Sequence, residues 1–135
     1  MIEVTAAFLV HKDKVLIARR KNPPQLAGKW EFPGGKIEEG ETPRVCLARE
    51  MEEEFRIQIE VGDFVAASAH HQVDRTFHIQ AYRAKWISGQ IEPTAHDRYA
   101  WAGPADLLAY DLLPADVELA KILIEKGFMR IGWNA

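Results

Sequence analysis

The sequence is poor in several residue classes, and each shortage excludes a kind of protein. It holds a single cysteine, Cys46, so no disulfide can form within the chain and a reducing compartment is expected. No apolar run reaches the roughly 18–20 residues that a membrane-spanning helix needs. The net charge is only -3, so we expect neither a nucleic-acid polymer nor a membrane surface as a partner.

The residues that are present are typical of one globular domain. Hydrophobic residues make up 47% and charged residues 27% of the 135 positions, which suits a chain with one core. There is no repeat or long linker, and we therefore expect a single domain over residues 1–135. Met1 leads into IEVTAAFLV without the basic start or cleavage site of a signal peptide, so we expect a cytoplasmic protein. The oligomeric state is left open.

Apolar runs and alternation predict the strands. Short strands are expected before the first helix, and two longer ones after it. The segment KNPPQLAG is expected to form a loop, and Pro33-Gly34-Gly35 to close the third strand. The predicted strands are Ile2–Val10, Val15–Arg19, Trp30–Phe32, Ile57–Ala69, Phe77–Trp86 and Tyr99–Trp101, with His70–Arg75 connecting the two long ones.

Helix signals occur at three places. Thr42, followed by proline, fits an N-cap with proline at the first helical position, and apolar residues recur with helical period up to Phe55. Further helices are predicted over Pro104–Ala109 and Pro114–Lys126, the second with Gly127 as its stop. Because strands and helices mix without a regular βαβ alternation, the predicted fold class is α+β with a mixed sheet.

The first predicted helix carries a concentration of acids in AREMEEEFR, residues 48–56. Glu50, Glu53 and Glu54 lie at i, i+3 and i+4 and so share one face, whereas Glu52 points elsewhere. Like charges at this spacing destabilise a helix by on the order of 0.2–0.5 kcal/mol per pair. These acids also lie near the helix C-terminus, where the macrodipole disfavours negative charge.

The acidic face has two interpretations that its pattern alone leaves open. It is either a solvated surface or a site for a cation. Hard divalent cations bind carboxylate oxygens, and Mg²⁺ typically takes one or two carboxylates, several waters and the phosphate oxygens of a substrate. The cation hypothesis therefore predicts a metal-dependent site that acts on phosphates.

Residues around the acidic face match a longer pattern of fixed spacing. The chain reads Gly35-x5-Glu41-x7-Arg49-Glu50-Met51-x-Glu53-Glu54-x-Arg56-Ile57. This resembles the box of the Nudix hydrolases, G-x5-E-x7-R-E-U-x-E-E-x-G-U, where U is aliphatic. Every specified position matches except the glycine, which is Arg56 here. The resemblance implies the family's fold, a mixed β-sheet between helices (α/β/α), and hydrolysis of a diphosphate linked to another group.

The resemblance also implies roles for the box residues. Arg49 would pair with the acids, and Glu41 would brace the loop against the helix. A water attacks phosphorus, and Glu50 is the first candidate for the base that takes its proton, with Glu53 and Glu41 as alternatives. The metal, Mg²⁺ or Mn²⁺ in its place, would be bound by Glu50, Glu53, Glu54 and the carbonyl of Gly35.

Arg56 and Cys46 differ from the residues that the family usually has at these positions. Arg56 stands where a glycine would adopt the left-handed conformation after the helix, at a cost of roughly 1 kcal/mol. It lies beyond the three acids, so we interpret the change as affecting stability rather than chemistry. The alternative is a catalytically silent nucleotide-binding module. Cys46 lies one turn before Glu50, and we expect a buried structural thiol.

A third departure lies in the loop before Trp101. Many family members carry a glutamate there that joins the metal site, and the corresponding residue here is Ala95. Glu92 or Asp97 could take its place. Otherwise the metal is bound by fewer side chains.

Within the family, the chain is most similar to the MutT-like branch, which cleaves nucleoside triphosphates to monophosphate and pyrophosphate. The similarity rests on Ala18-Arg19-Arg20, Trp30–Gly35 and Leu113-Pro114-Ala115-Asp116. Arg20 matches a position that approaches the substrate; the alternative is a surface arginine. Asp116 matches the position that reads the base edge, and Pro-Ala-Asp is typical of the CTP pyrophosphohydrolase type. Its alternative role is that of a favourable residue in the first turn of a helix.

The chemistry of Asp116 bears on the choice of base. An ionised aspartate only accepts hydrogen bonds, so it favours bases with an amino group, such as cytosine or adenine. The leading substrates are therefore CTP, dCTP and 5-methyl-dCTP, and oxidised purine triphosphates such as 8-oxo-dGTP are the alternative. A nucleotide sugar or a dinucleotide is a further, less favoured substrate class.

Overall fold

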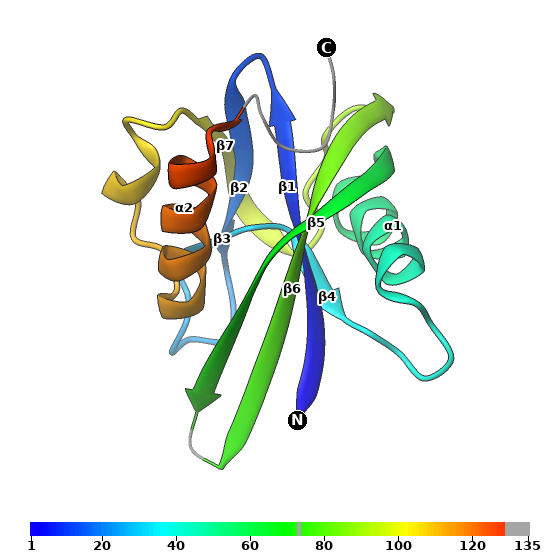
Figure 1. Ribbon diagram of the computed structural model, residues 1–135, viewed down its shortest axis with the longest axis vertical. Helices are drawn as coiled ribbons and strands as arrows, with labels where there is room; N and C mark the ends of the chain where they lie inside the picture. Colours follow the sequence, from blue (N-terminus) through cyan, green and yellow to red (C-terminus); the bar gives the residue numbers. More distant parts are fainter. Residues whose placement is uncertain (73, 129–135) are drawn as a thin grey trace.

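The computed structural model describes residues 1–72 and 74–128 and has the expected α+β class (Figure 1). A mixed sheet carries one helix on each side. No helix in these two ranges is long and apolar enough to cross a membrane. The elements are β1 (Ile2–His11), β2 (Lys14–Arg20), β3 (Trp30–Glu31), β4 (Gly34–Lys36), α1 (Pro43–Phe55), β5 (Gln58–Gln72), β6 (Arg75–Ser88), β7 (His96–Ala102), the 3-10 helix η1 (Leu107–Ala109) and α2 (Pro114–Lys126).

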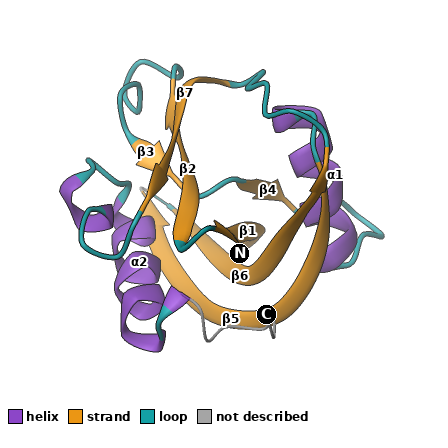
Figure 2. Ribbon diagram, turned by 90° about the horizontal axis from the view of Figure 1, so that it is seen from above, coloured by secondary structure: helices purple, strands orange, loops and turns teal. Residues whose placement is uncertain are grey.

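Strand β1 lies at the centre of the sheet and gives it its mixed character. The strand order is β3-β2-β1-β6-β5, with β4 also paired to β1 and β7 to β2. β1 and β6 run parallel, from Ile2 opposite Phe77 to Leu9 opposite Ala84, whereas the other pairs of named strands are antiparallel. Figure 2 shows the strands curving between α1 and α2.

Alternation along β1 buries residues on both faces of the sheet, so the chain forms two apolar clusters rather than one. Phe8 belongs to the cluster on the α2 side, with Leu119 and Leu123. Its neighbour Leu9 belongs to the cluster on the α1 side, with Met51. All five side chains are fully buried, and burial of each such side chain stabilises the fold by about 1.5–3 kcal/mol. The expected arrangement of a sheet between helices is confirmed.

Helix α1 begins and ends where the sequence predicts. The Thr42 hydroxyl accepts a hydrogen bond from the Val45 backbone N–H at 3.2 Å, and Pro43 is the first helical residue. At the other end, Arg56 adopts the left-handed conformation, with φ 57° and ψ 33°. The arginine therefore takes the conformation that the family's glycine adopts more easily.

The segment Pro33–Gly35, expected to close a strand, leads instead into another one. Strand β4 pairs antiparallel with β1, and Gly34 lies opposite Ala6. A Cβ on Gly34 would overlap the carbonyl oxygen of Thr5, and its φ of 156° also favours glycine. Strand β3 does end before Pro33, as expected, but β4 was not predicted, because two glycines carry no apolar pattern and the pairing is provided by β1.

The connection predicted at His70–Arg75 is wrong. Strand β5 continues to Gln72, so His70 pairs with Phe77 and His71 with Thr76. Figure 1 shows this end of the hairpin extending past both helices. Strands that leave the core need no alternation of apolar and polar residues, which is why the pattern faded there.

The last third of the chain follows the prediction more closely. Helix α2 covers Pro114–Lys126, and Gly127 ends it with φ 81°. The strand predicted at Tyr99–Trp101 extends over His96–Ala102, because it pairs with most of β2. The helix predicted from Pro104 is a 3-10 turn confined to Leu107–Ala109.

Candidate functional site

Arg49 lies at the centre of the box residues and contacts three of their acids. Its Nε and Nη2 donate to the two carboxylate oxygens of Glu41, at 2.6 and 2.9 Å. Its Nη1 donates to Glu50 and to Glu53, at 3.0 Å each. One planar guanidinium thereby joins the loop before α1 to two acids on the helix.

Glu41 fastens the loop that precedes α1. One of its oxygens accepts the backbone N–H of Glu38 at 2.9 Å. The hydrogen bonds from Arg49, and then this backbone bond, lower the pKa of Glu41 to about 2. The same pairing raises the pKa of Arg49 above its usual value. An acid this strongly ionised is suited to hold the loop and is a poor acceptor for a water proton.

The carboxyl group of Glu50 lies directly against the backbone of Gly35. A Cβ added to Gly35 would come within 2.5 and 2.7 Å of the two Glu50 oxygens, so any larger residue would displace this acid. Gly35 is held there because it pairs with Thr5 of β1. The backbone of β4 and the acidic face of α1 therefore border the same small space.

Of the three acids on this face of α1, Glu54 is the one that lines the adjacent pocket, which is described below. Its pKa is raised to about 8, first by burial, then by a hydrogen bond with Glu50, and further by the charge of Glu31. Near neutral pH Glu54 is therefore largely protonated. A positive charge at this place would relieve the repulsion that holds the proton.

The acids have the composition of a divalent-cation site, although they do not surround a common point. Within residues 1–72 and 74–128, no three acidic, histidine or cysteine side chains converge closely enough to hold a metal ion. The reason is Arg49, which draws Glu50 and Glu53 to itself. Glu50, Glu53 and Glu54 together with the Gly35 carbonyl would form an all-oxygen set, the kind that Mg²⁺ prefers. The residues present therefore fit a hard divalent cation.

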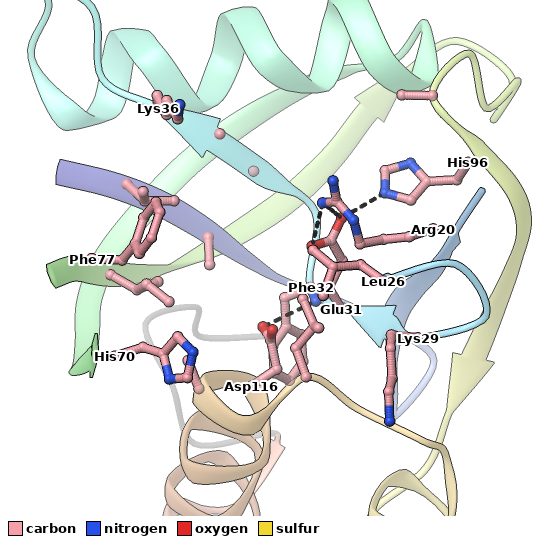
Figure 3. Close-up of a pocket in the computed structure, with 18 of the residues that line it drawn as sticks. Arg20, Leu26, Lys29, Glu31, Phe32, Lys36, His70, Phe77, His96 and Asp116 are labelled. Atoms are coloured by element: carbon pink, nitrogen blue, oxygen red, sulfur yellow. Dashed lines mark hydrogen bonds and ion pairs between the residues drawn. The ribbon is translucent and has the colours of Figure 1, made fainter. Parts of the chain in front are cut away.

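A pocket of about 760 Å³ opens beside the acids (Figure 3). Its size is in the range of sites for small-molecule ligands. Glu54 of α1 and Gly35 of β4 are among its lining residues. Asp116 lies at the α2 end (Figure 3). Figure 3 shows the two side walls, one with Phe77 and His70 and the other with Arg20, Glu31 and His96.

Asp116 is buried at the α2 end of the pocket, with 6% of its surface exposed. Its Oδ1 accepts the backbone N–H of Phe32 at 3.3 Å. Burial first, and then the charge of Glu31, raise the pKa of Asp116 to about 8. The expectation of an ionised aspartate is therefore wrong near neutral pH. The protonated acid both donates and accepts hydrogen bonds.

Arg20 lines the pocket but is turned toward Glu31. Its Nη1 donates to both oxygens of Glu31, at 3.1 Å each. Its Nε donates to the backbone carbonyl of Asn22 at 3.2 Å. The charge of Arg20 is thus shared with a carboxylate of the wall before any ligand approaches.

Glu31 and His96 were not predicted as functional residues. Nε2 of His96 lies 2.8 Å from Oε2 of Glu31, and both residues line the pocket. They are 65 positions apart and meet because β3 and β7 both pair with β2. The sequence offered only weak signals for them. Glu31 lies within the segment Trp30–Gly35, on which the similarity to the MutT-like branch rests, and His96 is next to Ala95, which stands at the position of the family's loop glutamate.

The two candidates for the missing loop glutamate are engaged elsewhere. Asp97 accepts a hydrogen bond from Arg19 at 2.8 Å, and Glu92 lies 3.7 Å from Arg56. Ala95 itself lines the pocket. The acids of the box therefore stay the candidate ligands for a metal.

The same loop closes the C-terminal end of α1. The Thr94 hydroxyl donates to the carbonyl of Glu53 at 2.9 Å, and its backbone N–H donates to the carbonyl of Glu54 at 2.9 Å. The backbone N–H of Glu92 donates to the carbonyl of Phe55 at 3.0 Å. These donors satisfy carbonyls that a helix end leaves without partners.

Cys46 is fully buried beneath the box, as expected. Its thiol lies 3.4 Å from the Thr5 hydroxyl and donates to the carbonyl of Lys36 at 3.3 Å. Burial raises the pKa of the thiol, so the neutral form packs between β1, β4 and α1.

The chain is similar to known proteins over most of its length. The family model described as the NUDIX domain matches residues 1–123. The CTP pyrophosphohydrolase of Escherichia coli K12 is 38% identical over 119 residues, which cover 88% of each chain. A putative 8-oxo-dGTP diphosphatase 2 of Mycobacterium tuberculosis is 38% identical over 120 residues, covering 84% of this chain and 81% of that one.

Solved structures show a similar fold. The solution structure of the E. coli ORF135 protein has a TM-score of 0.86 and 36% identity, over 93% of this chain and 90% of that chain. The crystal structure of a MutT protein from Methanosarcina mazei Go1 has a TM-score of 0.79 and 25% identity, over 93% and 91% of the two chains.

Proposed function

The chain belongs to the Nudix hydrolase family, and we propose that it cleaves a nucleoside triphosphate to the monophosphate and pyrophosphate, with cytidine triphosphates as the leading substrates. One observation carries this proposal. The acidic face of α1, of which Glu54 lines the pocket, lies at one end of a pocket whose other end holds the buried Asp116. A nucleoside triphosphate carries its phosphates at one end and the polar edge of its base at the other. These two ends match the two ends of the pocket.

The chain's residues divide the work at the phosphate end. Glu50, Glu53, Glu54 and the Gly35 carbonyl would hold Mg²⁺, which when bound neutralises charge on the phosphates and makes water more acidic. Glu50 is our choice for the base that takes the proton of the attacking water. Glu53 is the alternative. Glu41 is less suited than either, because its two oxygens are occupied by Arg49 and by the loop backbone.

At the end of the pocket proposed for the base, Asp116 acts in its protonated form. The carboxylic acid hydroxyl can donate to N3 of cytosine while its carbonyl accepts from the N4 amino group. Protonated Asp116, with one donor and one acceptor, thus complements the cytosine edge better than an ionised carboxylate does. The identity of 38% to a CTP pyrophosphohydrolase supports the same choice.

Oxidised purine triphosphates are the second candidate, and the same residue supports them. With its two oxygens exchanged, protonated Asp116 donates to O6 of a guanine ring and accepts from its N1–H. The chain is also 38% identical to a putative 8-oxo-dGTP diphosphatase. A silent nucleotide-binding module and a hydrolase of nucleotide sugars or dinucleotides are less favoured, since the box acids are intact and the relatives above are named for nucleoside triphosphates.

A panel of nucleotides with Mg²⁺ tests this proposal, with pyrophosphate and orthophosphate measured separately. We expect pyrophosphate from CTP or dCTP in preference to other triphosphates. Preferred turnover of 8-oxo-dGTP would select the second candidate. Tight binding of one nucleotide without turnover of any would instead favour the silent module.

Two glutamine variants on one helix test the metal assignment. Glu53→Gln should lower kcat by at least about a hundredfold, because a charged ligand is lost from the site. Glu52→Gln removes the same charge from the neighbouring, exposed position and should retain nearly full turnover. Equal activities of the two variants would refute the assignment.

A further inference from the structure

Glu31 is held by donors from two strands and faces the pocket between the α1 acids and Asp116. Arg20 donates to both of its oxygens at 3.1 Å, and Nε2 of His96 lies 2.8 Å from Oε2. In the described part of the chain, Oε1 is bonded only to Arg20, so one of its lone pairs stays available. Glu31 lines the pocket, with 17% of its side chain exposed. It can therefore accept one hydrogen bond from a ligand.

His96 supplies its hydrogen bond from a defined nitrogen. The side chain is buried, with 4% exposed, and Nδ1 has no hydrogen-bond partner among the described residues. A buried N–H without an acceptor is costly, whereas a bare ring nitrogen costs less, so Nε2 carries the hydrogen. His96 thus donates Nε2–H to Glu31.

The ring of His96 is fixed by the elements around it. It stacks on Phe55, with ring centroids 5.3 Å apart and planes inclined by 19°. Its backbone lies opposite Arg20 in the ladder between β7 and β2. Phe55 directly follows Glu54 at the end of α1, so His96 joins the pocket wall to the helix that carries the acids.

We propose that His96 is a positioning residue for the nucleotide: with Arg20 it holds Glu31 so that Oε1 accepts a hydrogen bond from the nucleoside. This inference rests on the proposed hydrolysis of nucleoside triphosphates. Arg20 compensates the charge of Glu31, which would otherwise repel the triphosphate. The donor is a hydroxyl of the sugar or an amino group of the base. His96 itself does not touch the reacting atoms, so its loss should affect binding more than turnover.

Two substitutions separate the hydrogen bond from the packing. His96→Phe keeps a flat ring against Phe55 but removes the donor, whereas His96→Gln provides an N–H near the position of Nε2. In the presence of Mg²⁺, His96→Phe should raise KM roughly three- to tenfold for the preferred nucleotide, with kcat changed less than about twofold. His96→Gln should recover most of the loss. Thermal melts of both variants establish that they are folded.

Four nucleotides identify the donor that Glu31 accepts. A loss in His96→Phe confined to CTP and UTP, compared with dCTP and dUTP, assigns the sugar 2′-hydroxyl. A loss confined to CTP and dCTP assigns the cytosine amino group. An equal loss on all four assigns the 3′-hydroxyl, which they share. Each of these results supports the proposal.

Other results overturn it. These are an unchanged KM in His96→Phe, an equal loss in the glutamine variant, or ¹⁵N spectra of the imidazole that place the hydrogen on Nδ1. Absence of turnover by the wild-type chain on every nucleotide would refute the proposed function instead. In that case the dissociation constant of cytidine monophosphate decides, because an equal value for wild type and His96→Phe would refute this inference too.

Discussion

Carboxyl groups of one site differ widely in their affinity for protons, and their surroundings explain why. Asp116 and Glu54 have pKa values raised to about 8, because both are buried near other carboxyl groups. Glu41 has a pKa lowered to about 2, because Arg49 and a backbone N–H bind its ionised form. At neutral pH the site thus contains a permanent anion beside acids that can exchange protons.

Asp116 should make the protein less stable as the pH rises. Its folded-state pKa of about 8 lies above the unfolded value, so between about pH 4 and 8 the native state binds more protons than the unfolded state. The free energy of unfolding should therefore fall with pH in this window, with an Asp116 share on the order of a few kcal/mol between pH 5 and 8. Asp116→Asn, neutral at every pH, should show a flatter profile in urea unfolding without added metal.

Some slope should remain in the Asp116→Asn variant, because the raised pKa of Glu54 acts in the same direction. The informative quantity is the difference between the two profiles. Parallel profiles for wild type and variant would contradict a buried, proton-binding Asp116.

The same substitution should change the preference among bases. Asparagine must turn its carbonyl oxygen to the Phe32 backbone N–H and so presents its NH₂ as the donor, whereas the protonated acid can carry its hydrogen on either oxygen. We expect Asp116→Asn to reorder kcat/KM across cytosine and purine triphosphates by roughly tenfold or more, with kcat on the preferred one retained. An unaltered ranking across the panel would remove Asp116 from base recognition.

At the scale of elements, both ends of α1 are capped by hydrogen bonds to groups outside the helix. Thr42 provides the hydroxyl at the beginning, and Thr94 and Glu92 provide donors at the end. Arg56 is the weak position, since it holds a left-handed conformation while its ion pair with Glu92 is exposed and 3.7 Å long. Exposed pairs of this kind contribute little.

Arg56→Gly should stabilise the fold. Glycine adopts φ near +57° without the contact that Cβ makes, so the free energy of unfolding should rise by roughly 0.5–1 kcal/mol. Arg56→Ala is the matched control: it loses the same ion pair but keeps Cβ, and should give no gain. If the two variants melt at the same temperature, the backbone of Arg56 is not strained. Turnover should change little in either, because Arg56 lies outside the pocket lining.

For the whole molecule, the pocket is an assembly of distant segments. The β1 strand separates two apolar clusters, and each cluster holds one helix against the sheet. The end of α1 and the start of α2 thereby face a common space (Figure 3). A ligand bound at either end should therefore stabilise the entire domain.

Divalent metal should raise the melting temperature. A ligand that binds only the folded state adds about 2.7 kcal/mol at a hundredfold excess over its dissociation constant, which corresponds to several degrees. We expect this rise with Mg²⁺ in wild type and in Glu52→Gln, and reversal by a chelator. Glu53→Gln should lose most of it. A shift of equal size in all three proteins would place the metal elsewhere.

Much of the site followed from the sequence, because the decisive relations are local. Spacing along one helix puts Glu50, Glu53 and Glu54 on a common face, and Thr42 and the following proline mark its beginning. Such relations need only the geometry of a helix. The α+β class could be predicted for a similar reason, from periodicities of short segments, whereas the placing of the sheet between helices was implied by the resemblance to the family.

Other features depend on residues far apart in the chain, and only the tertiary structure decided them. Burial gave Asp116 its proton, and the pairing of β2 with β3 and β7 brought Arg20, Glu31 and His96 together. A residue's pKa and its partners are set by what surrounds it in space, and no local pattern encodes that surrounding. The sequence by itself therefore determined which acids could bind a metal, whereas the folded chain determined how the pocket beside them is charged.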